Sequence, residues 1–263
     1  MQIATALERY LISSNTHVSS SKEKKFYISD MSKCKRMRFL KRKGVGAEYD
    51  PFVNWIFKMG ELIHDFGYKG LESQGLLLSA EETMFDDNFV GRYDGTIKNI
   101  KDGLKSVFDF KSISPYGLKK IMDGGGDEAS MSQVLSYTMM MRERHEGISD
   151  TGSVVYINKA PSDQIPQVFF QKDYHLTPWR EGKLKDEMKE MVEFWDNDKI
   201  PICTCSGWSK GPKYNQYFPL CQAEEKDIKK YLKMVKDNDK KLITTKTGLY
   251  LIDGENRKEL IKL

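Results

Sequence analysis

The chain has 263 residues, of which 39% are hydrophobic and 30% are charged, and its net charge is +4 at pH 7. This length allows one large core, or a core with a small appendage, and no apolar run approaches the length of a membrane span. The first residues lack the basic start and the long apolar stretch of a secretory signal. We therefore expect a cytoplasmic protein with reduced cysteines and no membrane contact.

Hydrophobic periodicity and turn residues predict the elements in chain order. The predicted helices cover residues 1–14, Ser29-Asp30 to Leu40, 52–71, 129–144, 179–195 and 224–237. The predicted strands cover residues 82–85, 88–97, 104–111, 153–158 and 167–174, with a last hairpin over 242–252. Helices and strands alternate in this order, which predicts an α/β core.

Basic residues are concentrated near the start of the chain. Between Lys22 and Lys43 there are ten basic and two acidic residues, a local charge of +8, so the remainder carries −4. A basic face on an otherwise acidic protein is a candidate nucleic-acid footprint. A solvated helix face is an equally good interpretation of this segment alone.

Two acids and a lysine follow one another in two neighbouring predicted strands. Asp94 lies in Gly91-Arg92-Tyr93-Asp94-Gly95, and Asp109 and Lys111 lie two apart in Asp109-Phe110-Lys111. A turn at Asp102-Gly103 brings the two strands together. Two carboxylates can bind a hard divalent ion and an ammonium can orient a water molecule, which favours phosphodiester cleavage. A solvated sheet face is the plain alternative.

Three further residues are candidates for the same site. His64, on the helix over 52–71, offers an imidazole ligand, although a lone histidine on such a helix is usually structural. Gln133 and Tyr137 lie four apart and so share a face of the Met-rich helix over 129–144. They offer hydrogen bonds and a stacking surface, and in isolation an ordinary helix surface explains them.

Together these motifs are more specific than any one of them. The series G-x-x-x-H, G-x-x-D-G, D-F-K and Q-x-x-x-Y resembles the PD-(D/E)xK nucleases of the RecB type over roughly residues 27–221. The resemblance implies a restriction-endonuclease-like mixed sheet flanked by helices. It implies a Mg²⁺ or Mn²⁺ site formed by His64, Asp94, Asp109 and the main-chain carbonyl of Phe110. It also implies that Lys111 positions the attacking water and that Gln133 and Tyr137 contact substrate.

The four cysteines extend the resemblance. Cys34 precedes the motifs, and Cys203, Cys205 and Cys221 follow them. This arrangement resembles the AddB nuclease domain and the CRISPR-associated Cas-type exonucleases, in which four thiolates hold a [4Fe–4S] cluster as a clasp. The C-x-C spacing departs from the usual C-x-x-C. Zn²⁺ accepts the same ligands and is the main alternative, and unligated thiols are another.

Lysines and aromatic residues alternate between Cys205 and Cys221, which suits binding of single-stranded DNA, although a small aromatic core around the metal is equally consistent. The candidate DNA-binding residues, from this loop and the basic segment, are Lys35, Arg36, Arg38, Trp208 and Lys210.

The predicted function is a metal-dependent DNA exonuclease acting on ends or single strands in recombination, CRISPR-type or phage DNA processing, in the host cytoplasm if phage-encoded. It leaves room for protein partners in a DNA-processing complex. A DNA-binding clasp protein with a vestigial nuclease site and a structure-specific endonuclease are the alternatives. The predicted segments are an N-terminal helix and linker (1–26), the nuclease core with its clasp (27–222) and a C-terminal helix and hairpin (223–263).

Overall fold

The computed structural model describes residues 18–19, 24–49, 51–99, 101–205, 216–235, 240–245 and 248–262. The chain divides into two compact units, which are described separately. The central unit consists of residues 27–32 and 58–189. The described residues up to Phe26, those from Lys33 to Phe57 and those from Glu190 onward belong to the terminal unit. The division into three segments expected from the sequence stays a prediction.

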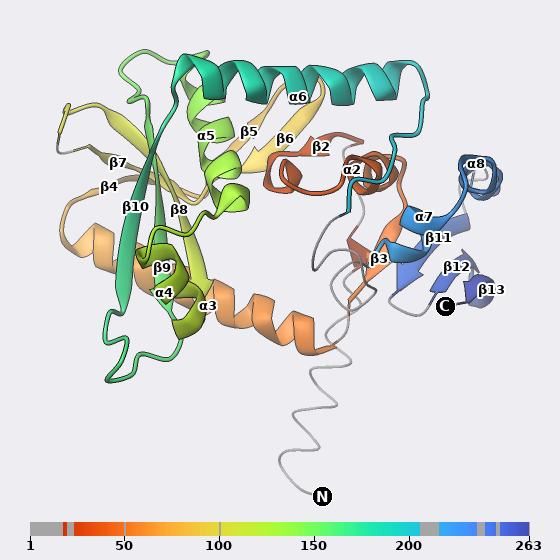
Figure 1. Ribbon diagram of the computed structural model, residues 1–263, viewed down its shortest axis with the longest axis horizontal. Helices are drawn as coiled ribbons and strands as arrows, with labels where there is room; N and C mark the ends of the chain where they lie inside the picture. The colour runs from red at the N-terminus through yellow and green to blue at the C-terminus, as the bar shows by residue number, and fades with distance from the viewer. Residues whose placement is uncertain are drawn as a thin grey trace, which may run out of the picture. The chain divides into compact units, whose positions relative to one another are not determined.

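The central unit is built on a mixed five-stranded sheet with the strand order β10-β9-β8-β7-β4 (Figure 1). Its strands are β4 (Leu77–Ala80), β7 (Gly95–Lys98), β8 (Lys105–Ile113), β9 (Thr151–Asn158) and β10 (Phe169–His175). The β8–β9 pair is parallel and the other pairs are antiparallel. The connection from β8 to β9 contains α4 (Pro115–Met122) and α5 (Glu128–Arg142). The predicted α/β fold class with a mixed sheet is confirmed.

Helices cover both faces of this sheet. Phe108 and Phe110 point from β8 into a core cluster that includes Ile63, Tyr68 and Leu71 of α3 (Pro51–Ser73). Because side chains alternate along a strand, Asp109 and Lys111 point to the other face, where α5 packs. Strand β8 therefore has an apolar face, with Phe108 and Phe110, and a polar face, with Asp109 and Lys111, as the sequence predicts.

A second, smaller sheet continues from the first. It has the order β2-β6-β5, with β2 at Phe26–Tyr27, β5 at Thr83–Phe85 and β6 at Phe89–Arg92. Backbone hydrogen bonds join the bend between β4 and β5 to the bend between β6 and β7, from Glu81 N–H to the Asp94 carbonyl (2.9 Å) and from Tyr93 N–H to the Glu82 carbonyl (3.2 Å). One long antiparallel ladder thus bends from one sheet into the other at Asp94.

The terminal unit contains a sheet with the order β1-β3-β11-β12-β13. Its strands are β1 (Val18–Ser19), β3 (Gly46–Glu48), β11 (Lys240–Thr245), β12 (Gly248–Asp253) and β13 (Asn256–Lys262). The unit also contains α2 (Lys35–Arg42), α7 (Phe218–Gln222) and α8 (Glu225–Lys233), and α6 (Pro178–Asp196) begins in the central unit and ends in the terminal one. No helix among the described residues is long and apolar enough to cross a membrane.

Several predicted elements differ from the structure. The helix predicted from Ser29-Asp30 to Leu40 is wrong at its start: a 3-10 turn, η1 (Ile28–Asp30), comes first, and α2 begins only after Cys34. The extended backbone of Cys34 (φ −50°, ψ 127°) breaks the helical path there. The strand predicted over 88–97 is broken at Tyr93 and Asp94, where the ladder bends. The helix predicted over 1–14 lies outside the described residues.

Candidate metal centre and active site

Asp109 and Lys111 form an ion pair on the polar face of β8. The Nζ of Lys111 lies 2.6 Å from Oδ2 of Asp109, which is 1% exposed. Gln133 of α5 joins them: its Nε2 donates to Oδ1 of Asp109 (2.9 Å), and its Oε1 accepts from Lys111 Nζ (3.1 Å). Oδ1 of Asp109 is therefore hydrogen-bonded, whereas the buried Oδ2 has the ion pair with Lys111 but no hydrogen bond among the described residues.

Asp94 lies beside this pair at the bend of the long ladder. Its Oδ2 accepts a hydrogen bond from the Phe110 N–H (2.6 Å), and the same oxygen lies 3.7 Å from Nδ1 of His64. The pairing of Gly95 with Phe108 in the β7–β8 hairpin brings the two acidic strands together. The predicted turn at Asp102-Gly103 closes that hairpin, with Gly103 in the left-handed region (φ +72°).

His64 reaches the site from α3. Its ring centroid lies 5.6 Å from that of Phe110, the residue between Asp109 and Lys111. Burial lowers the pKa of His64 from its usual value, while the charge of Asp109 opposes that shift. A neutral imidazole is the form that binds metal ions.

The two carboxyl groups have perturbed acidities. Burial and the charge of Asp109 raise the pKa of Asp94 to about 7. Burial also raises the pKa of Asp109, although Lys111 opposes the effect. Two buried carboxylates that repel one another favour the binding of a cation between them.

The donor set fits a divalent ion in its chemistry. Two carboxylates, a neutral imidazole and a nearby main-chain segment supply oxygen and nitrogen ligands of the kind that Mn²⁺ and Mg²⁺ accept. Among the described residues, however, His64, Asp94 and Asp109 do not bring three ligand atoms within 4.8 Å of one another, as the cysteines below do. Lys111, paired with Asp109, supplies a positive charge at the place where a cation would bind.

Tyr137 has a different position from the one expected. It is 0% exposed, and its hydroxyl donates to the Arg92 carbonyl (3.1 Å), so it cannot stack on a base. A Cβ at Gly91 would lie 2.6 Å from the Tyr137 ring and one at Gly95 would lie 2.5 Å from the Ser79 carbonyl. Both glycines of the G-x-x-D-G motif are therefore required for close packing around Asp94.

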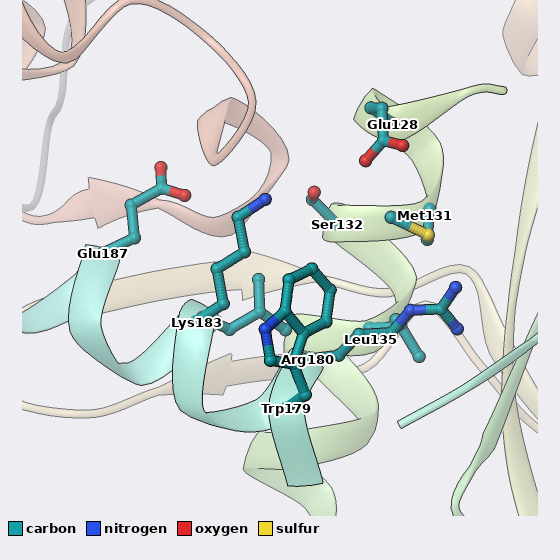
Figure 2. Close-up of a pocket in the computed structure, with 9 residues that line it drawn as sticks. Glu128, Met131, Ser132, Leu135, Trp179, Arg180, Lys183 and Glu187 are labelled. Atoms are coloured by element: carbon teal, nitrogen blue, oxygen red, sulfur yellow. The ribbon is translucent and has the colours of Figure 1, made fainter. Parts of the chain in front are cut away.

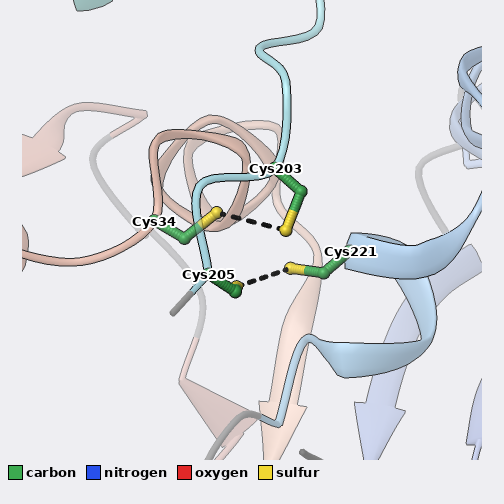
Figure 3. Close-up of side chains that lie close together, drawn as sticks. All are labelled: Cys34, Cys203, Cys205 and Cys221. Atoms are coloured by element: carbon green, nitrogen blue, oxygen red, sulfur yellow. Dashed lines mark hydrogen bonds between the residues drawn. The ribbon is translucent and has the colours of Figure 1, made fainter. Parts of the chain in front are cut away.

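The four cysteines meet in the terminal unit (Figure 3). Cys34 precedes α2, Cys203 and Cys205 follow α6, and Cys221 lies on α7. All four Sγ atoms lie within 4.8 Å of one another. The Cys34–Cys203 and Cys205–Cys221 sulfur pairs are 3.9 Å and 3.8 Å apart. The predicted grouping of the cysteines into one candidate metal site is confirmed, and the metal itself stays a prediction.

Contacts within the cysteine cluster shift the acidities of its thiols. The Cys221 thiol and the Thr204 N–H, which donates to Cys34 Sγ (3.3 Å), lower the pKa of Cys34 to about 4. Burial and the thiol of Cys203 raise the pKa of Cys205 to about 12. A bound cation would lower the pKa of Cys205, because metal ions deprotonate coordinating thiols outright.

The candidate DNA-binding residues of α2 have contacts within the terminal unit. Lys35 pairs with Glu190, and Arg38 is 2% exposed. Arg36 donates to the carbonyls of Pro201 (2.8 Å), Cys221 (3.0 Å) and Ala223 (3.0 Å), which ties the cysteine-bearing segments to α2. These contacts indicate a structural role for α2. Trp208 and Lys210 lie outside the described residues.

A hollow of about 210 Å³ lies elsewhere in the central unit, between α5 and α6 (Figure 2). Its α5 residues are Glu128, Met131, Ser132 and Leu135, on the side of the helix away from Gln133 and Tyr137. Trp179, 71% exposed, and Lys183 line the other wall. This hollow is separate from the candidate metal centre.

Sequence reasoning missed two residues at the rim of the centre, Glu81 and Arg92. Arg92 lies inside the G-x-x-D-G motif, two residues before Asp94. Its positive charge so close to a candidate metal ligand could have identified it from the sequence. No feature of the sequence indicates Glu81, because its place opposite Asp94 depends on the pairing of β4 with β7, and β4 was not predicted.

No protein-family model and no curated protein matches the chain. Among solved structures it is similar to SSO0001, at 16% identity and a TM-score of 0.48, over 85% of this chain and 98% of that one. It is also similar to the alkaline exonuclease LHK-Exo of Laribacter hongkongensis (10% identity, TM-score 0.45, 67% of this chain and 90% of that one). A phage-related exonuclease of Haemophilus somnus 129PT is a further neighbour (14% identity, TM-score 0.37, 66% of this chain and 94% of that one). Likenesses this distant do not define a family for the chain.

Proposed function

We propose that the protein is a divalent-metal-dependent deoxyribonuclease of the PD-(D/E)xK type, acting as an exonuclease on DNA ends or single strands. The observation that carries this proposal is the convergence of His64, Asp94 and the Asp109–Lys111 pair from three separate elements. Buried carboxylates of raised pKa beside a lysine are costly to a fold, and they are frequent at catalytic sites.

Each residue has a distinct task in this proposal. His64, Asp94, Asp109 and the Phe110 carbonyl would hold Mn²⁺ or Mg²⁺, which supplies a Lewis acid that activates water and offsets phosphate charge. Lys111, as an ammonium, would orient that water and offset negative charge on the phosphate. Gln133 fixes the Asp109 carboxylate, and Tyr137 positions the Arg92–Asp94 segment.

Digestion of linear DNA tests the proposal. We expect activity with Mn²⁺ at least equal to that with Mg²⁺, because a nitrogen ligand is better tolerated by Mn²⁺, and no activity with Ca²⁺ or excess EDTA. His64→Ala should weaken activation by Mn²⁺, whereas His175→Ala, a change of an exposed histidine on β10, should not. Cleavage that persists in EDTA would refute the metal-dependent mechanism.

Two alternatives have clear outcomes in the same assay. Because Lys111 and Gln133 already engage both oxygens of Asp109, a vestigial site that only binds DNA is the second candidate. Binding without Mn²⁺-dependent cleavage would support it. A covalently closed circle has no ends, so its digestion would identify an endonuclease instead.

We further propose that the four thiolates bind metal and close the terminal unit. The resemblance implies a [4Fe–4S] cluster, whereas the sulfur spacing favours one tetrahedral ion. Zn–S bonds of about 2.3 Å place all sulfurs about 3.8 Å apart; two of the six pairs lie at 3.8 Å and 3.9 Å, and all six lie within 4.8 Å. Thiolates that bind four different irons must lie farther apart. Metal analysis of protein purified without oxygen separates the two: brown protein with iron, or colourless protein with one zinc per chain.

A further inference from the structure

Glu81 and Arg92 occupy the rim of the candidate metal centre through the pairing of the bent ladder. Ala80 pairs with Gly95, and Thr83 pairs with Arg92. The Glu81 N–H donates to the Asp94 carbonyl (2.9 Å) in the same register. Glu81 therefore lies directly opposite Asp94, and Arg92 lies two pairs away, at the diagonal position on the same face.

Arg92 extends outward from this position. Tyr93, the next residue, is 1% exposed and turns its hydroxyl inward to Glu82. The Arg92 side chain, in contrast, is 63% exposed, and its guanidinium lies 3.5 Å from the Glu81 carboxylate. Two residues of chain span about 6.6 Å at most, so the backbone of Arg92 lies close to that of Asp94.

Glu81 is an unfavourable residue for the fold at this place. Its backbone lies in the left-handed region (φ +51°), which glycine or asparagine adopts at lower cost. Its charge also lies opposite that of Asp94, and like charges at opposite positions of a ladder destabilise it. Strain of this kind gathers at functional sites, where the residue has a task other than stability.

We propose that Arg92 binds a backbone phosphate of the DNA beside the scissile bond, and that Glu81 holds its guanidinium at the rim until that phosphate replaces the carboxylate. This inference rests on the proposed nuclease function. A guanidinium forms paired hydrogen bonds with phosphate oxygens as readily as with a carboxylate. When a phosphate replaces the Glu81 carboxylate, Arg92 therefore still has an anionic partner. The ion pair is exposed and 3.5 Å long, which makes it easy to open.

Equilibrium binding tests the inference without cleavage. The whole chain, purified without chelators so that any metal at the cysteines stays bound, is titrated against a fluorescent single-stranded oligonucleotide. The buffer contains Ca²⁺ and several salt concentrations are used. The variants are Arg92→Gln, Arg92→Lys, Glu81→Gln and the double variant, each checked for an unchanged melting temperature. Lys101→Gln is the matched control: Lys101 also forms an exposed ion pair (3.2 Å, with Asp173), near the far end of β7.

We expect Arg92→Gln to weaken binding by about tenfold and to reduce the slope of log Kd against log salt by about 0.7, the contribution of one phosphate contact on a single strand. Arg92→Lys should retain the slope and lose part of the affinity. Glu81→Gln should bind several-fold more tightly than wild type, because the competing carboxylate is gone, and the double variant should match Arg92→Gln.

Three results would overturn the inference. One is an Arg92→Gln variant that binds DNA like Lys101→Gln. Another is a Glu81→Gln variant with weaker Mn²⁺ binding and an unchanged DNA affinity, which would make Glu81 a metal ligand. Wild-type protein that binds no DNA at all would remove the proposed nuclease function together with this inference, whereas the first two results would leave that function intact.

Discussion

At the scale of single residues, the candidate site is held together by groups that are unfavourable in the metal-free protein. Asp94 and Asp109 are buried near each other, and the pKa of Asp94 is raised to about 7. Lys111 offsets part of this repulsion through its 2.6 Å ion pair with Asp109. Two carboxylates that repel each other in the absence of a cation bind a cation more readily. Metal binding at Asp94 and Asp109 should therefore raise the stability of the folded protein.

Asp94→Asn should change the stability of the protein in a pH-dependent way. Because the folded pKa of Asp94 (about 7) exceeds the value of 3.8 for an ordinary aspartate, the wild type loses stability as pH rises between these two values. Without added Mn²⁺ or Mg²⁺, Asp94→Asn should match the wild type near pH 4. It should be more stable at pH 8 by on the order of 1–3 kcal/mol.

Thermal melts across this pH range measure the effect. Added Mn²⁺ should raise the melting temperature of the wild type at pH 8 and should raise that of Asp94→Asn much less. A variant that is less stable than the wild type at pH 8 would contradict the assignment of Asp94 as a buried, repelled carboxylate.

At the scale of elements, the site depends on the close approach of α5 to the bent ladder. Tyr137 packs where a side chain at position 91 would be, with only 2.6 Å available for a Cβ. Gly91→Ala should therefore displace Tyr137 or the Asp94 segment and destabilise the protein by about 1–3 kcal/mol, the usual cost of overpacking.

Gly60→Ala is the matched control for this change. Gly60 lies within α3, and a Cβ there would meet nothing within 4 Å, so alanine should stabilise the helix by about 0.5–1 kcal/mol. Chemical denaturation of the two variants measures both effects. If Gly91→Ala were as stable as Gly60→Ala, the packing account of the G-x-x-D-G motif would be wrong.

The elements also show how far the sequence leads. The β7–β8 hairpin follows from local signals, because Asp102-Gly103 selects the turn and alternation places Asp109 and Lys111 together. The bend at Asp94 and the short strands β3 and β4 were missed, because they depend on pairing with strands that are not their neighbours in the chain. Strand β13 was missed although it forms a local hairpin with β12. The start of α2 was misplaced because Cys34 leaves the helical path to meet the other thiols. The Q-x-x-x-Y spacing places Gln133 and Tyr137 on one face of a helix, but it does not show that the Tyr137 side chain is buried.

At the scale of the whole molecule, the cysteines join segments that are distant in the chain. Cys34 and Cys203 are 169 residues apart, and both belong to the terminal unit. A metal that binds all four thiolates contributes its binding free energy to folding, because the unfolded chain has no preformed site. The long loop adds an entropic term that grows slowly with length.

Cys34→Ala should therefore lower thermal stability and soluble yield more than Lys111→Ala does. Removal of one of four ligands weakens a metal site that joins segments distant in the chain, whereas Lys111→Ala removes only contacts within the central unit, the ion pair with Asp109 and the hydrogen bond to Gln133. Metal content per chain, measured beside the melting temperature, checks the cause. Equal stability of Cys34→Ala and wild type, with no metal in either, would rule out the clasp.

The nuclease assignment is tested most directly by the cleavage of linear DNA with Asp109→Ala and Lys111→Ala in Mn²⁺, with DNA binding measured on the same proteins. Asp109→Ala removes a proposed metal ligand, and Lys111→Ala removes the group that activates the water. Each change should reduce the cleavage rate on the order of a hundredfold or more, while DNA affinity stays close to that of the wild type. Unchanged turnover in either variant would contradict the proposed active site.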